Sequence, residues 1–452
     1  MLQEYNIIEK VGYNIYNKNM SRISEIVAQL NTLPKGYISK KIIHNKVYFY
    51  LQKKNNGKLI SEYIKESDVK EIENKLKKRT KLEKELRTLL NTGKVLKEPS
   101  KNAQEYTGYL MSKDTKVIEF DKGEIIYVNE QLCPLYFKRY KDIQGFLKKR
   151  AIDQTRTNSR LLKKVLGIKT NEEDKISLYA NGATITDDYW FKPKGSKLTY
   201  KDVSFDGDFY SDLSLKGEVI VYPKTPRLTP DITTPGSYEK CWKKENGEWW
   251  LYKKGNEEEL FSEMFCARLA EKMKIPTAHY ELSGSEIKTR NFADKQNFEP
   301  MSSIAGEDDS YDNVFDELYK LDKRIAKEYI RLVFFDALVN NVDRHNENCG
   351  VMRERKTGKT ISLAPNFDDN VALISRSKIL NMDASKDGFI SYFVKFLKSN
   401  DKAAKIYKEM KFPILNEKLI DSCFKEIEIK EDSKSIKNYL LNRYKYLTNI
   451  RV

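Results

Sequence analysis

The sequence predicts an α+β protein with two or three hydrophobic cores, because strand-like and helix-like periodicities alternate along a chain too long for one core. The chain has 452 residues, of which 40% are hydrophobic and 12% aromatic, and this composition excludes wholesale disorder. We expect a small basic hairpin-plus-helix module over residues 1–100, an N-terminal lobe over residues 101–284 and a helical C-terminal lobe over residues 285–452.

Composition also excludes several classes of protein. No apolar run approaches the roughly 18 residues of a membrane span, and the first ten residues lack the pattern of a signal peptide. The five cysteines are scattered and form no CxxC pair, and the chain has three histidines, which argues against a zinc site and for a reducing compartment. We therefore expect a cytoplasmic protein without membrane contact.

The first 100 residues carry most of the net positive charge. The formal net charge of the chain is +16, and this segment holds 21 Lys and Arg against 11 Asp and Glu. Alternating apolar residues around the turn-forming Asn55-Asn56-Gly57 predict a hairpin, and the apolar spacing from Glu66 to Leu90 predicts a helix. The segment resembles a short bacterial module of unassigned function.

Two functions are open for this basic module. In a nucleic-acid contact its lysines and arginines would neutralise phosphates, and Tyr48 or Tyr50 would stack on bases. In the alternative, a solvated helix packs on the hairpin and forms a dimerisation arm.

The middle of the chain predicts a hairpin over Lys116 to Asn129, then helices over Leu135 to Arg150 and Asn158 to Leu166. A small, polar loop from Leu228 to Lys240 then leads to a strand, Trp249 to Lys253, through a turn at Asn246-Gly247. Such a loop covers phosphates with backbone N–H groups and hydroxyls where a small residue allows close approach. Here Gly236 is that residue, with Thr234 and Ser237 beside it, although most loops of this composition are only turns.

A lysine and a glutamate follow this loop with kinase-like spacing. Lys253 ends the apolar strand, and Glu263 lies near the start of a helix predicted over Phe261 to Met273. A strand lysine paired with a helix glutamate holds the α- and β-phosphates of ATP in protein kinases. Taken separately, each residue also has a purely structural explanation. Lys253 would extend into solvent from the end of a strand, and Glu263 would be favoured by the dipole at a helix N-terminus. Lys254 would replace Lys253 if the strand register shifted by one residue.

The third cluster follows an apolar helix that ends near Val339. Asp343 and Asn348 have the D-x-x-x-x-N spacing of the catalytic base and metal-binding asparagine of a kinase catalytic loop. A hairpin formed by Gly350 to Met352 and Thr360 to Leu363 then leads to Asp368, which would complete a Mg²⁺ site. After a strand at Thr277 to Leu282 we expect a polar excursion from Ser283 to Tyr311, and four helices follow residue 388.

From about residue 130 to the C-terminus the sequence resembles the HipA-like serine/threonine kinases, especially their standalone bacterial, CtkA-like branch. The matching segments are Thr186–Trp190, Thr233–Trp242, Leu251–Lys253, Ser262-Glu263, Asp343-Arg344-His345 with Asn348, and Ala364–Asp368. The resemblance implies a bilobal protein-kinase-like fold related to the phosphoinositide 3/4-kinases. It also implies ATP- and Mg²⁺-dependent phosphoryl transfer to Ser or Thr, with autophosphorylation in the glycine-containing loop.

By this resemblance Thr233 is the first autophosphorylation candidate and Thr234 the second. Asp343 would be the base, Asn348 and Asp368 would hold the metal, and Lys253 with Glu263 would fix the phosphates that Thr234, Gly236 and Ser237 cover. One departure concerns Asp368-Asp369-Asn370, where family members commonly have Asp-Asn-Gly. Another is that residues 1–100 do not resemble the N-terminal subdomain of HipA.

The resemblance also suggests partners: a protein substrate, with a translation factor as one guess, and an antitoxin. A growth-arresting toxin and a phage-defence effector are both compatible with it. Two alternatives stay open, a degraded kinase that acts as a nucleic-acid-binding or scaffold protein, and a kinase for a lipid or another small molecule.

Overall fold

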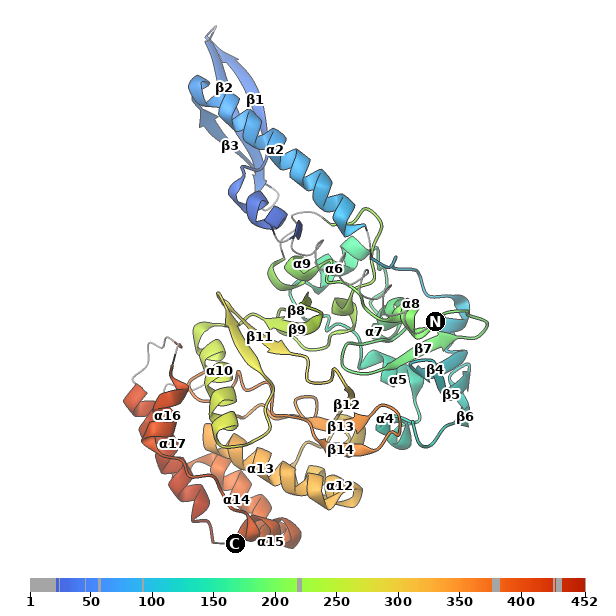
Figure 1. Ribbon diagram of the computed structural model, residues 1–452, viewed down its shortest axis with the longest axis vertical. Coiled ribbons are helices and arrows are strands. Elements are labelled where there is room, and N and C mark those ends of the chain that lie inside the picture. The colour runs from blue at the N-terminus through green and yellow to red at the C-terminus, as the bar shows by residue number, and fades with distance from the viewer. Residues whose placement is uncertain are drawn as a thin grey trace, which may run out of the picture. The chain divides into compact units, whose positions relative to one another are not determined.

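The computed structural model describes residues 22–23, 25–44, 46–55, 58–91, 93–217, 222–375, 383–425, 427 and 433–451. These residues group into two compact units, Met1–Leu96 with Gly217–Leu228, and Lys97–Lys216 with Thr229–Val452. The described part of the chain contains four small antiparallel sheets and many helices, so the predicted α+β class is confirmed (Figure 1). None of its described helices has the length and apolar character needed to span a membrane.

The first unit contains the predicted hairpin and helix, with one further strand. Its strands β1 (Tyr37–Ile43), β2 (Lys46–Asn55) and β3 (Lys58–Ile64) form a sheet in the order β1-β2-β3, and α2 (Glu66–Leu90) follows. Helix α2 packs against β2 and buries Leu82, Leu86 and Leu90. The predicted turn residues Asn56 and Gly57 lie outside the described residues.

The second unit begins with a sheet of order β6-β5-β4-β7. Its core includes Phe120, Phe137 and Phe191. The elements of this part are α3 (Lys101–Gln104), β4 (Gly108–Ser112), β5 (Thr115–Asp121), β6 (Glu124–Val128), α4 (Leu135–Arg139), α5 (Ile143–Lys148), α6 (Ser159–Leu166), α7 (Glu173–Ser177), η1 (Leu178–Ala180), β7 (Tyr189–Pro193), α8 (Tyr200–Val203) and α9 (Ser211–Lys216).

The single helix predicted over Leu135 to Arg150 is wrong, because the segment forms the two helices α4 and α5. Lys141 has a positive φ of 52°, which ends helical geometry. The carboxylate of Asp142 then accepts hydrogen bonds from the backbone N–H groups of Gln144 and Gly145, so it caps a new helix.

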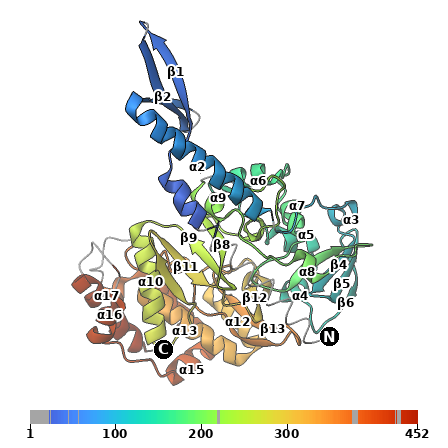
Figure 2. The ribbon, with the colours of Figure 1, turned by 45° about the horizontal axis from the view of Figure 1, so that its top comes forward.

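A second sheet, of order β10-β11-β9-β8, carries Lys253 at the end of β9. Its elements are η2 (Pro230–Thr233), β8 (Lys240–Glu245), β9 (Glu248–Lys253), α10 (Glu257–Lys272), β10 (Tyr280–Ser283) and β11 (Glu286–Arg290). Asn246 and Gly247 both have positive φ in the β8–β9 turn, as an Asn-Gly hairpin requires. Helix α10 packs on β10 and β11, and Figures 1 and 2 show it beside β11. The helix begins at Glu257 because Asn256 and Glu259 form a capping box.

The predicted polar excursion from Ser283 to Tyr311 is also wrong. It contains strand β11, which pairs with β9 and β10 in the middle of the sheet, and strand β12 of the next sheet. Strand β11 has the sequence EIKTR, in which Ile287 is the one apolar residue. No alternation of apolar residues marks such a strand, and its pairing with two neighbours stabilises it instead.

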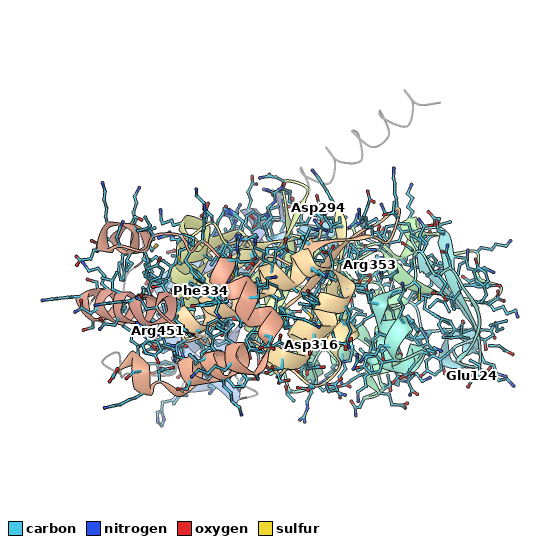
Figure 3. The ribbon with its side chains drawn as sticks, turned by 90° about the horizontal axis from the view of Figure 1, so that it is seen from below. Glu124, Asp294, Asp316, Phe334, Arg353 and Arg451 are labelled. Carbon is cyan, nitrogen blue, oxygen red and sulfur yellow. The ribbon has the colours of Figure 1, made fainter. Side chains whose placement is uncertain are left out.

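The last sheet, β12-β13-β14, leads into the helical part of the unit. Phe334 of α13, labelled in Figure 3, stacks on Phe412 with ring centroids 4.3 Å apart, inside the largest apolar core. The elements are β12 (Gln296–Pro300), α11 (Ser302–Ala305), α12 (Tyr311–Leu321), α13 (Lys323–Val339), β13 (Gly350–Glu354), β14 (Thr360–Leu363), η3 (Ala384–Lys386), α14 (Gly388–Ser399), α15 (Asp401–Glu409), α16 (Glu417–Cys423) and α17 (Ser433–Thr448). The four predicted C-terminal helices correspond to α14 to α17.

Candidate active site

Lys253 lies at the centre of the candidate site. It is the last residue of β9, and its Nζ lies 3.1 Å from Oε1 of Glu263 in α10 and 2.7 Å from Oδ1 of Asp368. The side chains of Lys253 and Glu263 are almost fully buried. Lys253, and not the adjacent Lys254, is therefore the lysine that contacts the helix glutamate.

Lys253 and Asp368 keep each other ionised despite their burial, whereas burial raises the pKa of Glu263 against the opposing effect of Lys253. Burial disfavours the charge on Lys253, but the carboxylates of Asp368 and Glu263 outweigh that effect and keep its pKa well above the usual value. Burial also opposes ionisation of Asp368, yet the ammonium groups of Lys253 and Lys240 outweigh it and lower the pKa of Asp368 to about 2. The carboxylate that the sequence suggests as a metal ligand is thus charged at neutral pH.

The loop after α13 carries Asp343 and Asn348. Helix α13 ends at Val339, and the residue that caps it, Asn340, has a left-handed backbone. Nδ2 of Asn348 donates to the backbone carbonyl of Asp343, 3.1 Å away, and this bond closes the loop. The Asp343 side chain is half-buried, and within the described residues its carboxylate oxygens accept no hydrogen bond. Asp343 is thereby open to an acceptor hydroxyl, and the side-chain oxygen of Asn348 to a metal ion.

Arg344 binds this loop to the segment that carries Asp368. Its buried guanidinium pairs with Asp336 of α13 and with Asp369, each at 2.8 Å. It also donates to the carbonyls of Asn348 and Phe367, at 2.8 and 2.7 Å. Asp343 and Asn348 are therefore held against the chain at Phe367, directly before Asp368.

Asp368 and Asp369 have different environments, although they are adjacent. Asp368 has a φ of 65°, an uncommon value for a residue other than glycine and one that aspartate tolerates. Asp369 points into the arginine network, where it also accepts from Asn366 at 2.5 Å, and burial raises its pKa to about 6 against the opposing effect of Arg344. Asp369 thus serves as a structural partner of Arg344.

The loop between η2 and β8 is held closed by Arg156. This guanidinium is 1% exposed and donates to the carbonyls of Thr234 (2.6 Å) and Gly236 (2.9 Å). The hydroxyls of Thr233 and Thr234 are buried, and both donate to the carbonyl of Pro230. Neither autophosphorylation candidate can therefore receive a phosphoryl group while the loop keeps this conformation.

A second lysine, Lys240, belongs to the site and was missed in the sequence. It is the first residue of β8, and its Cα is the register partner of Lys253. A Cβ on Gly236 would lie 2.3 Å from its Nζ, so the glycine leaves room for this ammonium under the loop. Burial lowers the pKa of Lys240 to about 8, against the pull of Asp368. The sequence could have predicted this residue, because the hairpin around Asn246-Gly247 places Lys240 opposite Lys253.

The donor set fits Mg²⁺, which favours oxygen ligands from one or two side chains together with phosphates. The ionised carboxylate of Asp368 and the side-chain oxygen of Asn348 supply such ligands. Lys253 and Lys240 supply two positive charges beside them, with the loop of Thr234, Gly236 and Ser237 next to Lys240. This arrangement suits a metal-bound polyphosphate.

Parts of the chain are similar to known families and to solved structures. Residues 221–428 match the family model of the HipA-like C-terminal domain, and residues 19–74 match a domain of unknown function, DUF6788. No curated protein matches the chain. Among solved structures, the chain is similar to the Helicobacter pylori proinflammatory kinase CtkA, with 15% identity, a TM-score of 0.39, and coverage of 46% of this chain and 90% of that chain. It is also similar to a chain of the Shewanella oneidensis MR-1 complex of the toxin–antitoxin proteins HipA and HipB with operator DNA, with 13% identity, a TM-score of 0.45, and coverage of 76% and 100%.

Proposed function

Because residues 221–428 form a HipA-like C-terminal domain, we propose that this chain is an ATP- and Mg²⁺-dependent serine/threonine protein kinase that phosphorylates itself. The observation that carries the proposal is the contact of Lys253 with both Glu263 and Asp368. Protein kinases use a strand lysine, a helix glutamate and an acidic residue after the catalytic loop for phosphoryl transfer. The division into residues 1–100, 101–284 and 285–452 is part of the proposal.

The residues divide the work of phosphoryl transfer. Lys253, oriented by Glu263, binds the α- and β-phosphates, and Lys240 binds phosphate oxygens under the loop. Asn348 and Asp368 would hold Mg²⁺, which would neutralise charge that develops on the phosphates. Asp343 accepts the proton of the acceptor hydroxyl as its oxygen bonds to the γ-phosphorus and the bond to the leaving diphosphate breaks.

Autophosphorylation at Thr233, or next at Thr234, requires the loop to open, because both hydroxyls are buried against Pro230. A phosphate there adds about −1.5 to −2 charges beside the site. The buried position cannot accept that charge without a partner. We infer that the phosphorylated loop stays away from ATP and that autophosphorylation lowers activity.

The cellular role is the least direct part of the proposal. HipA is found with HipB and operator DNA in one of the similar structures, and on this ground we propose a cytoplasmic toxin with an antitoxin partner. A phage-defence effector is the second role compatible with the site. A protein substrate, such as a translation factor, follows from the HipA-like resemblance.

Transfer of radiolabel from ATP tests the kinase. Wild-type protein with Mg²⁺ is expected to label itself, and Asp343→Asn is expected to bind ATP without labelling. Glu347→Gln is the matched control, because Glu347 is exposed in the same loop and pairs with Lys149 outside the site. Absence of label in the wild-type protein and in every protein of a cell extract would refute the proposal, and label in a lipid or metabolite alone would identify a small-molecule kinase.

A second function, nucleic-acid contact, is favoured by one face of the sheet in the first unit. Tyr37 and Tyr63 are 57% and 59% exposed. The strand register places Tyr48, Tyr50 and Tyr63 on the same face, and the rings of Tyr50 and Tyr63 lie 5.9 Å apart. Exposed aromatic rings beside lysines are the elements of a stacking platform for single-stranded nucleic acid.

Retention of the full chain on single-stranded DNA and RNA tests this contact. We expect retention that weakens with salt and is lost in Tyr48→Ala/Tyr63→Ala. Tyr127→Ala is the control, since Tyr127 is 46% exposed and belongs to the other unit. Equal retention of all variants would contradict the proposal that this face of the sheet binds single-stranded nucleic acid.

A further inference from the structure

A basic cavity beside α6 has no part in the proposed kinase site. Its volume is about 680 Å³, within the range of about 300–1,000 Å³ that is common for small-ligand pockets. Four cations line it (Arg160, Lys163, Lys164 and Lys169), together with the amides of Gln154 and Asn171. The lining residues include no carboxylate.

The local sequence gathers these cations on one side. Arg160, Lys163 and Lys164 are spaced i, i+3 and i+4 on α6, so their side chains share one face of the helix. Gly167 ends the helix with a φ of 75°, a left-handed value that glycine adopts without strain. The chain then turns, and Lys169 reaches the same cavity.

Among the described residues, Lys163 is a buried cation whose hydrogen-bond partners include no carboxylate. The residue is 5% exposed, and its Nζ donates to Oδ1 of Asn171 at 2.8 Å and to Oε1 of Gln154 at 3.4 Å. Both acceptors are neutral, and an ammonium has three N–H donors. Burial and the neighbouring Arg160 lower the pKa of Lys163. Buried charges in proteins are ordinarily paired, so the cavity carries positive charge that the fold does not balance.

We propose that this cavity binds a small anion that carries a diphosphate group. One phosphate contributes about −1.5 to −2 charges, which offsets about half of the four cations, and two linked phosphates offset nearly all of them. Because Lys163 is only 5% exposed, a compact ligand reaches its ammonium more readily than a nucleic-acid backbone that lies across the surface. Free diphosphate and the diphosphate end of a nucleotide share this chemistry.

Lysine footprinting with inorganic pyrophosphate, in a Mg²⁺-free buffer and on the full chain, locates the binding. We expect acetylation of Lys164 and Lys169 to fall several-fold, while the exposed Lys148 and Lys201, elsewhere in the same unit, keep their reactivity. Equal protection of all four lysines, or equal protection by sulfate at matched ionic strength, would overturn the proposal, because both outcomes describe general ion screening.

The variant Lys163→Met separates binding from folding. Methionine keeps the buried aliphatic stem and removes the unbalanced charge, so the variant is expected to melt at the same or a higher temperature. We expect its footprint at Lys164 and Lys169 to require about tenfold more pyrophosphate or more. An unchanged footprint in this variant would refute the site.

The source of the diphosphate is settled by two further ligands. Tighter protection by ADP than by pyrophosphate identifies a nucleotide ligand, and equal protection identifies free diphosphate. Stronger protection by single-stranded DNA than by either would overturn the proposal of a small anion. These readouts do not depend on phosphoryl transfer, so they remain valid if the kinase assay fails.

Discussion

The ammonium of Lys253 lies 2.7 Å from the carboxylate of Asp368, 115 positions later in the chain. One residue ends a strand of the β10-β11-β9-β8 sheet, and the other follows the β13–β14 hairpin. Their charges offset each other in a buried setting, where an isolated charge is costly. A metal-bound nucleotide would separate them, giving the phosphates to the lysine and the metal to the aspartate.

Replacing Lys253 tests this arrangement. Lys253→Met removes the charge that holds the phosphates, and loss of one such group costs about 10²–10³ in rate. We expect a decrease of that size in autophosphorylation, with weaker ATP binding in a calorimetric titration. Lys254→Met is the matched control and is expected to keep wild-type activity. The reverse result would mean that Lys254 binds the nucleotide.

The pKa of Lys240, about 8, predicts a pH dependence of ATP affinity. Below about pH 8 the amine is charged and binds phosphate, and as the pH rises through 8 it loses its proton. We expect ATP affinity to fall through this range in the wild-type protein. In Lys240→Met affinity is lower, and the fall near pH 8 is absent; a fall that persists in this variant would contradict the role of Lys240.

The same lysine affects stability in the opposite direction. Its pKa in the folded protein lies below the ordinary lysine value of about 10.5, so folding favours the neutral amine. The cost of burying the charge is present below about pH 8 and is relieved as the pH rises toward 10.5. Urea unfolding at several pH values is expected to show Lys240→Met gaining stability relative to wild type below about pH 8. Equal stability of the two proteins at every pH would contradict this expectation.

Arg156 controls the accessibility of Thr233 and Thr234. The change Arg156→Gln removes the guanidinium bonds to the carbonyls of Thr234 and Gly236. We expect phosphate to appear at these threonines several-fold faster in a time course followed by mass spectrometry. Arg160→Gln, an exposed change in the following helix, serves as the control. A slower reaction in Arg156→Gln would show that the closed loop is the reactive one.

Arg344 is expected to be essential for stability. Its guanidinium joins Asp336, Asp369 and two backbone carbonyls in a buried network. Removing one partner of a buried charge pair costs about 3–5 kcal/mol, and we expect a loss of this size in the free energy of unfolding for Arg344→Met. Arg344→Lys should recover only part of it, because an ammonium lacks the planar fork. The exposed pair is the control: Arg324→Lys, beside Asp322, should change stability little, and an equal loss there would contradict the assignment.

Local signals in the sequence were sufficient for several elements. The Asn246-Gly247 turn and the β13–β14 hairpin both follow residues whose backbone preferences act over a few positions. The helix predicted over Phe261 to Met273 exists, but it begins four residues earlier, at Glu257, because Asn256 and Glu259 form a capping box. Strand β11 was not predicted, because pairing with β9 and β10 stabilises it and its sequence shows no alternation of apolar and polar residues. The break between α4 and α5 was not predicted, because the apolar pattern continues across it and one capping side chain, Asp142, starts a new helix.

The sequence by itself determined which chemical groups the chain carries and their order: the loop with Gly236, the strand lysine, the helix glutamate, the aspartate and asparagine that follow α13, and the final aspartate. The spacing of residues within a motif and the resemblance of short segments to a family are properties of neighbouring residues, so both can be recognised from the sequence alone. Only the tertiary structure decided three contacts: Lys253 pairs with Asp368, the ammonium of Lys240 lies next to Gly236, and Asp369 pairs with Arg344. The physical reason is that burial and charge from distant segments set these contacts and protonation states, and neither is a property of neighbouring residues.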